Sequence, residues 1–262
     1  MDRLFDFVFV RPPSDSYWKC VSTNPRSDEI DVNLAKAQHR QYCSILKDSG
    51  IEVLELPPLE GFPDSVFMQD PALLGSRRSI IGRFGEARRR GEEKTLMDDL
   101  RKYGERIGKP TQVTEPGSLE GGDIVVTEGG LFVGESERTN AVGIRQLADL
   151  LKGVNVAAVK TGLMHLLCGC AYLNNRTMII APELVDAKSF PGFKFIAIPK
   201  EEAYATDALY LGEMRVLVPS GFAKAHTNLK EAGYRPVEVE VSEFWKGDGG
   251  VTCLSSPVYK VL

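Results

Sequence analysis

A cysteine near the C-terminus follows a glycine-rich loop. The segment Gly247-Asp248-Gly249-Gly250-Val251-Thr252-Cys253 has three glycines in four residues, which permit tight turns and a close approach of the backbone to a ligand. We expect the loop to lead into a short strand that presents the thiol. A thiolate stabilised by a neighbouring or substrate cation is a competent nucleophile, whereas most free cysteines are small buried hydrophobes. Spacing alone favours neither role.

One histidine is better placed for acid–base chemistry than the other two. His165 lies among apolar residues, in the segment 161–167, where a lone histidine is commonly a satisfied core residue. His39 and His226 lie in polar segments with helical character. If a histidine transfers protons near neutral pH, His165 is the best candidate.

Two short segments carry paired carboxylates. Glu120 and Asp123 flank a glycine pair at the entrance to a predicted strand, and Asp64 and Asp70 flank an apolar stretch. At strand spacing, Asp64 and Asp70 share one face. Carboxylates around one pocket suit a planar guanidinium, which offers five donors in a fixed fork. Polar turns are the ordinary alternative for both segments.

Arginines stand at the beginnings of two predicted helices. Arg88-Arg89-Arg90 precedes one helix, and Glu137-Arg138-Thr139-Asn140 begins another. A helix N-terminus with an arginine beside it is a ready site for an anion such as an amino-acid carboxylate. The alternative is a solvated run of charge, which we prefer for Arg88 and Arg90.

Apolar periodicity predicts an α/β protein with an internal repeat. The predicted helices are 30–49, 92–107, 139–152 and 223–232, and the predicted strands are 7–10, 51–56, 65–68, 79–83, 123–127, 130–134, 155–159, 171–173, 178–181, 208–211, 215–218 and 236–241. Five strand–strand–helix–strand units of about 40–55 residues would account for nearly the whole chain. Arranged around an axis, they would form an α/β propeller with a central pocket, and a layered α/β sheet is the alternative.

The repeat would gather the reactive residues. Asp64, Glu120, His165 and Cys253 each stand beside the first strand of a unit. In a radial arrangement these strands would converge on one spot.

Bulk properties narrow the class of protein. The 262 residues contain no Pro/Gly/Ser linker, so we expect one domain, 1–262. A net charge of −4 argues against nucleic-acid binding. No apolar run approaches the ~20 residues of a membrane span, and the N-terminus does not resemble a signal peptide. Five cysteines without a zinc-ligand pattern indicate free thiols, a cytoplasmic location and no structural metal.

Together, these motifs resemble the dimethylarginine dimethylaminohydrolases, a family of the guanidine-modifying superfamily with arginine deiminases and amidinotransferases. The segment 37–42 also looks like that family's first helix. The likeness spans essentially the full chain, and six motifs in this order are specific although each alone is weak. They are Asp64-Ser65-Val66-Phe67-Met68-Gln69-Asp70, Arg89-Arg90-Gly91-Glu92, Glu120-Gly121-Gly122-Asp123, Glu137-Arg138-Thr139-Asn140, His165 and Gly249-Gly250-Val251-Thr252-Cys253.

The resemblance implies a five-bladed α/β propeller and a catalytic site that needs no metal or cofactor. Cys253 would be the nucleophile, His165 the general acid and base, and Glu120 with Asp70 the carboxylates that hold the guanidinium. The remaining implied contacts are Asp64 with the amino-acid end of the substrate, Arg89 and Arg138 with its carboxylate, Phe67 as a pocket wall and the backbone of Gly247 as pocket lining.

The implied reaction is hydrolysis of a methylated arginine to citrulline and an amine through a covalent thiouronium. Gln69 departs from the family, which usually has glutamate there, so arginine and monomethylarginine also stay open as substrates. The alternatives are an arginine deiminase releasing ammonia, an amidinotransferase, a catalytically silent binder of arginine-like ligands and a metallohydrolase. The expected partner is a small guanidine, and a homodimer is the assembly considered. The loop 12–25, with Tyr17 and Trp18, is a candidate lid.

Overall fold

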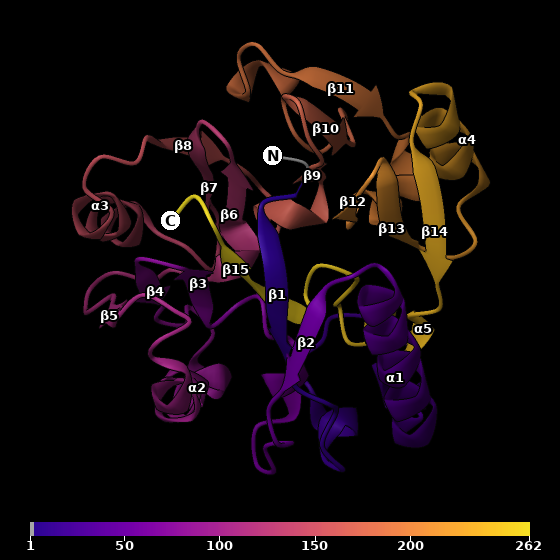
Figure 1. The fold of residues 1–262 in the computed structure, drawn as a ribbon. Coiled ribbons are helices and arrows are strands. Elements are labelled where there is room, and N and C mark those ends of the chain that lie inside the picture. The colour runs from indigo at the N-terminus through magenta and orange to yellow at the C-terminus, as the bar shows by residue number, and fades with distance from the viewer. Residues whose placement is uncertain (1–2) are drawn as a thin grey trace.

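The computed structural model describes residues 3–262, which form an α/β fold (Figure 1). The strands are β1 (Phe5–Val10), β2 (Glu52–Glu55), β3 (Ala72–Gly75), β4 (Ser79–Ile81), β5 (Pro110–Gln112), β6 (Ile124–Thr127), β7 (Gly130–Glu135), β8 (Val156–Lys160), β9 (Cys170–Tyr172), β10 (Thr177–Ile180), β11 (Lys194–Ala197), β12 (Leu209–Gly212), β13 (Arg215–Pro219), β14 (Arg235–Val239) and β15 (Ser255–Tyr259). The α-helices are α1 (Val32–Asp48), α2 (Glu92–Leu100), α3 (Ala141–Leu150), α4 (Ala223–Glu231) and α5 (Ser242–Trp245).

The strands repeat one pairing pattern. In β3-β4-β5, β6-β7-β8, β9-β10-β11 and β12-β13-β14, the first two strands are antiparallel and the third is parallel to the second. The C-terminal strand β15 supplies the first strand of the remaining group, because it pairs antiparallel with β1, which is parallel to β2. β15 also pairs with β3, and this joins two groups into the six-stranded sheet β2-β1-β15-β3-β4-β5.

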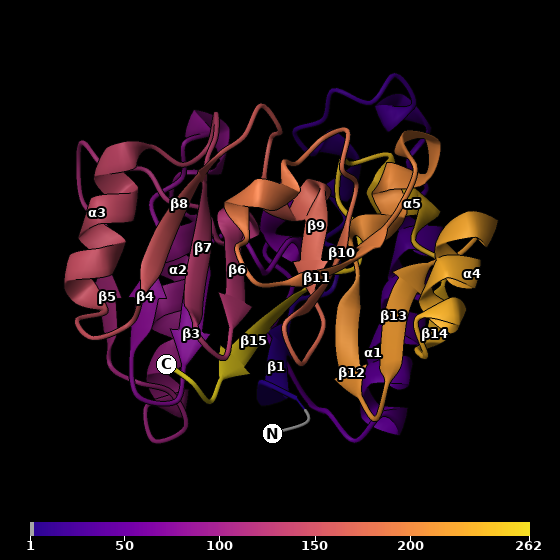
Figure 2. The same cartoon turned by 90° about the horizontal axis from the view of Figure 1, so that it is seen from above.

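The strands surround the middle of the molecule, and α1, α2, α3 and α4 lie outside them (Figure 1). From above, the C-terminus lies at one edge, and the indigo segment after β1 reaches the opposite edge (Figure 2). Between β10 and β11 the connection contains the 3-10 turn Ala187–Ser189 in place of an α-helix. The α/β class is therefore confirmed, and the predicted helix is missing from one unit. Within residues 3–262, no helix is long and apolar enough to cross a membrane.

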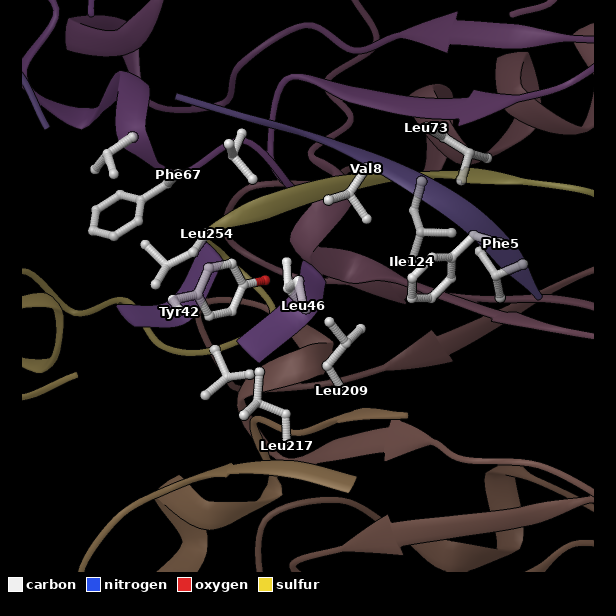
Figure 3. Packing of buried hydrophobic residues seen from close by; sticks show 14 of the residues in the cluster. Phe5, Val8, Tyr42, Leu46, Phe67, Leu73, Ile124, Leu209, Leu217 and Leu254 are labelled. Atoms are coloured by element: carbon white, nitrogen blue, oxygen red, sulfur yellow. The ribbon is translucent and has the colours of Figure 1, made fainter. Parts of the chain in front are cut away.

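The largest hydrophobic cluster joins side chains from different strand groups to α1 (Figure 3). Val8 of β1, Leu46 of α1 and Leu217 of β13 are fully buried in it, and each such side chain contributes about 1.5–3 kcal/mol to stability. Tyr42 is also buried, and its hydroxyl donates to Ser255 Oγ at 2.8 Å. This contact fixes α1 against the start of β15, two residues after Cys253.

The helix predicted at 30–49 is largely confirmed as α1. Its N-cap, Asp31, accepts hydrogen bonds from the backbone N–H groups of Asn33 and Leu34, and so satisfies two of the donors that a helix start leaves unpaired. After the helix, Gly50 adopts φ +72°, a conformation that glycine provides at little cost.

The region before β3 differs from the prediction. The strand predicted at 65–68 is wrong, because Pro63–Val66 forms a 3-10 turn that begins with proline, whose fixed φ suits a helical turn. The strand of this unit is β3, which starts after Pro71. The helix predicted at 92–107 ends at Leu100 and continues as the 3-10 turn Arg101–Tyr103.

Candidate active site

A narrow cavity collects eight of the ten side chains or backbone positions predicted for the site. Its lining comprises Val21, Asp64, Phe67, Asp70, Arg89, Arg138, Met164, His165, Gly247, Asp248, Gly249 and Cys253. The two predicted residues outside this lining are Gln69 and Glu120.

The reactive side chains converge because each precedes the first strand of a group. Asp70 precedes β3, Glu120 precedes β6, His165 precedes β9 and Cys253 precedes β15. Asp207 holds the same place before β12, and its Oδ2 accepts a hydrogen bond from Cys253 Sγ at 3.9 Å. Asp207 was not predicted from the sequence, although the same positional rule applies to the unit that begins at 208.

The surroundings of Cys253 favour its thiol form. Burial raises its pKa well above the ordinary value, and the nearby carboxylates of Asp207 and Asp70 raise it further. The carbonyl oxygen of Cys253 accepts from the N–H of Gln69 at 3.2 Å, which holds this turn beside the segment that carries Asp70. A guanidinium bound in the cavity would oppose these effects and favour the thiolate.

His165 is held between two carboxylates. Its Nε2 lies 2.8 Å from Oε2 of Glu120, and its Nδ1 lies 3.8 Å from Oδ1 of Asp70. Burial alone would lower the pKa of His165, but Asp70 and Glu120 together raise it to about 9. The ring is consequently an imidazolium at neutral pH, able to give a proton to a leaving group. Gly122 makes this packing possible, since a Cβ there would lie 2.6 Å from Nδ1 of His165.

Glu120 departs from its predicted placement. Its side chain is fully buried, and its Oε1 accepts from the backbone N–H groups of Gly85 at 2.9 Å and Glu86 at 3.3 Å. Its Oε2 lies against His165. Glu120 is not among the residues that line the cavity, so its part in holding a guanidinium stays a prediction. The contact it makes with His165 orients and charges the imidazole.

Asp70 keeps one oxygen available. Its Oδ2 accepts from Nη1 of Arg89 at 2.5 Å. Its Oδ1 is buried, and within residues 3–262 it has no hydrogen-bond partner. Leaving a buried acceptor unsatisfied costs about 1–3 kcal/mol, so this oxygen suits an N–H donor of a ligand.

The two predicted arginines differ in how fully they are paired. Arg89 is buried and binds both oxygens of Glu92, at 3.1 and 2.9 Å, as well as Asp70. Within the described chain, the guanidinium of Arg138 makes one ion pair, at 3.9 Å to Glu86. Arg138 therefore has more donors left for an anionic ligand than Arg89, whose contacts also hold Asp70 in place.

Gln69 does not face the cavity. Its Nε2 donates to the carbonyl oxygen of Gly121 at 3.3 Å, and its side chain lines a separate interior cavity together with Thr252 and Tyr259. Gln69 is not among the residues that line the cavity with Cys253, and its influence on the methylation preference stays a prediction. Gln69 and Asp70 are neighbours whose side chains point to different spaces, which the sequence pattern did not reveal.

The loop 12–25 closes one side of the cavity. The N–H of Val21 donates to both carboxylate oxygens of Asp64 at 3.1 Å, and burial raises the pKa of Asp64 although Arg89 opposes this. The ring of Tyr17 packs edge-on against Phe67 at 6.0 Å. Gly247 gives this loop room, since a Cβ there would lie 2.5 Å from the Tyr17 hydroxyl.

A metal site is the competing interpretation of the same residues. Ligand atoms of Asp70, Glu120 and His165 lie within 4.8 Å of one another. The hydrogen bond from Nε2 of His165 to Glu120 uses one of the two ring nitrogens and one carboxylate oxygen, and a charged ring has no lone pair to offer an ion. The set is better described as a charged hydrogen-bond relay.

Comparisons with known proteins agree over nearly the whole chain. The family model described as "N,N dimethylarginine dimethylhydrolase, eukaryotic" matches residues 13–260. N(G),N(G)-dimethylarginine dimethylaminohydrolase of Pseudomonas aeruginosa is 36% identical over 96% of this chain and 99% of that protein. An uncharacterized protein of Aeropyrum pernix is 43% identical over 100% of this chain and 98% of its own length.

A solved structure extends the agreement to three dimensions. The P. aeruginosa enzyme, as a cysteine-to-serine mutant complexed with citrulline, matches with a TM-score of 0.90 at 35% identity, covering 97% of this chain and 99% of that one. The family model, the full-length relatives and this fold lead to one conclusion: the chain belongs to the dimethylarginine dimethylaminohydrolase family.

Proposed function

We propose that the protein hydrolyses the guanidinium group of a methylated arginine to citrulline and an amine, through a thiouronium on Cys253. The protein is a hydrolase acting on C–N bonds, as its family indicates. The observation that carries the proposal is the shared cavity of Cys253, His165 and Asp70. The citrulline in the P. aeruginosa structure supports the assigned product.

Substrate binding uses the groups that remain available in the empty cavity. The guanidinium donates to Oδ1 of Asp70, the buried oxygen without a partner. At the amino-acid end, the carboxylate pairs with Arg138, and the ammonium lies near Asp64. Arg89 already holds the side chain of Asp70 in place, so Asp70 loses no further conformational freedom when it binds the guanidinium. Positioning of this kind lowers the reaction barrier by up to about 7–11 kcal/mol.

The reaction is a double displacement at the guanidinium carbon. The bound cation lowers the pKa of Cys253, whose thiol loses its proton to solvent, and the thiolate forms a C–S bond. His165 donates its proton to the departing amine as the C–N bond breaks, leaving a thiouronium and a neutral imidazole. The imidazole then takes a proton from water, and the hydroxide adds to carbon. As the C–S bond breaks, the remaining hydroxyl proton passes to the sulfur, which gives citrulline, the thiol of Cys253 and a charged His165.

Glu120→Gln is expected to shift the alkaline limb of the kcat–pH profile to lower pH by about one unit. Glu120 helps to raise the pKa of His165 to about 9. Glutamine preserves the shape but removes the negative charge, so that pKa falls and less imidazolium remains at a given alkaline pH. The profile is measured between about pH 6 and pH 10. If the alkaline limb of the profile stays at the same pH, Glu120 does not control the protonation of His165.

Arg138→Ala is expected to raise KM for arginine-type substrates about ten- to a hundredfold, the value of a charge-assisted hydrogen bond of about 1.5–3 kcal/mol. A guanidine without the carboxylate should be unaffected by this substitution. Arg88→Ala is the matched control, because Arg88 also pairs with Glu86 but is 70% exposed and lies outside the cavity lining. If KM changes equally in the two variants, Arg138 does not bind the substrate carboxylate.

A panel of guanidines tests the proposed function. The purified protein is incubated with arginine, monomethylarginine and dimethylarginine, and citrulline and the released amine are both quantified. Citrulline with methylamine or dimethylamine supports the proposal. Citrulline with ammonia from arginine alone would identify an arginine deiminase, and binding without turnover would identify a silent relative.

The wider architecture is also part of the proposal. We infer that residues 1–262 form a single catalytic domain whose five three-stranded groups are the blades of a propeller. The repeated antiparallel–parallel pairing and the placing of site residues before the first strands support this. A reducing cytoplasm suits the cysteines at 20, 43, 168, 170 and 253, all of which are free thiols.

A further inference from the structure

Asp207 is a buried carboxylate beside Cys253 that the mechanism above does not use. It follows the 3-10 turn Lys200–Thr206 and is 6% exposed. Its Oδ1 accepts from the backbone N–H of Thr252 at 2.7 Å and from the Thr252 hydroxyl at 2.6 Å. Its Oδ2 accepts from the thiol of Cys253 at 3.9 Å. The carboxylate therefore binds two successive residues of the proposed nucleophile's turn.

The structure is built to admit this carboxylate. A Cβ on Gly250 would lie 2.0 Å from Oδ2 of Asp207, so only glycine leaves room there. The hydroxyl of Tyr204 donates to the carbonyl oxygen of Gly249 at 2.7 Å. The turn that carries Asp207 is thus fastened to the loop that carries Cys253.

The charge of Asp207 is not neutralised by a neighbouring cation. Within residues 3–262, no Lys, Arg or His nitrogen forms a salt bridge with it. Burial raises the pKa of Asp207 to about 6, so the group is largely ionised at neutral pH. The other titratable groups that face the thiol or Asp207 are Tyr42, Asp70, His165, Cys168 and Tyr204.

We propose that Asp207 is the positioning residue of the nucleophile: it accepts the S–H hydrogen of Cys253, and its negative charge keeps the sulfur a neutral thiol until a guanidinium enters. Since the thiolate is the form that reacts with electrophiles and oxidants, this contact makes the empty site unreactive and links the nucleophile's activation to the charge of the substrate. The inference rests on the proposed function in taking Cys253 as the nucleophile.

Asp207→Asn tests the role of the charge. The amide is isosteric, its oxygen still accepts from Thr252, and its NH2 group can donate to the sulfur. We expect the pKa of the Cys253 thiol to fall by about one unit or more, and alkylation by iodoacetamide at pH 7 without substrate to become about tenfold faster. Mass spectrometry of the Cys253 peptide across pH separates this thiol from the other cysteines.

Thr252→Val is the matched control, because it removes the hydroxyl bound to Asp207 and keeps the charge. It is expected not to lower the thiol pKa. If Asp207→Asn folds poorly, Asp207→Ser replaces it in the test, because serine also removes the charge. The thiol pKa of Asp207→Ser is expected to fall as well. An unchanged or higher pKa without the carboxylate, or an equal fall in Thr252→Val, would overturn the inference.

The alkylation assay needs no turnover, so the two proposals fail in different ways. If the proposed function is wrong, no guanidine of the panel yields citrulline, whatever the alkylation profile. If the inference on Asp207 is wrong, the alkylation profiles of the wild-type protein and Asp207→Asn coincide, whether or not citrulline is formed.

Discussion

Cys253→Ser is expected to abolish citrulline formation, with a loss of roughly three orders of magnitude or more, while the fold stays intact. A serine hydroxyl is far harder to ionise than a thiol, and His165 is already protonated at neutral pH, so no base is available to activate it. Amine release measures the activity. The circular dichroism spectrum and Tm of the variant measure the fold.

Cys43→Ala is the control for cysteine loss in general. Cys43 lies on α1 and outside the cavity lining, so this variant should retain turnover. Full activity in Cys253→Ser would remove Cys253 from the nucleophile's role. Loss of activity in both variants, with a lowered Tm in each, would point to a structural effect.

The convergence of the site could be predicted because it depends on position within a repeat. Asp70, His165 and Cys253 each precede the first strand of a group. The strand pattern located β9, whereas the strand predicted at 65–68 placed Asp64 rather than Asp70 in this position. The same rule reaches Asp207 before β12. We did not apply it there, because Asp207 stands next to a predicted strand without a glycine pair or another motif to mark it.

The local differences from the prediction have a common physical origin. Val66 and Met68 are buried in a turn as completely as strand residues are, so apolar spacing did not distinguish the turn after Pro63 from a strand. The direction of Gln69 depends on its bond to the carbonyl oxygen of Gly121, a distant segment. Likewise, Glu120 is occupied by backbone N–H groups at Gly85 and Glu86. Such partners are set by the tertiary fold and leave no local signal.

The electrostatics of the site were beyond sequence reasoning for the same reason. His165 lies in an apolar segment, which by itself predicts a neutral ring. The fold instead brings Asp70 and Glu120 against its two nitrogens, and their charges outweigh the effect of burial on its pKa. A histidine that resembled a core residue is thereby a proton donor.

His165→Ala is expected to reduce turnover of methylated arginines about a hundred- to ten-thousandfold, the usual contribution of general acid–base catalysis. The same variant should form the covalent intermediate without hydrolysing it when the leaving group is changed.

An analogue that expels a thiol in place of an amine needs no proton from His165, so Cys253 should still form the C–S bond. Hydrolysis of that bond needs a base and should stall, which leaves a covalent adduct visible by mass spectrometry on the Cys253 peptide. The wild-type protein should turn the analogue over without accumulating the adduct. If His165→Ala releases citrulline from the analogue as fast as the wild-type protein does, His165 is not the base that activates water. A different group would then have to take that role, and Asp207, which contacts the sulfur, would be the candidate.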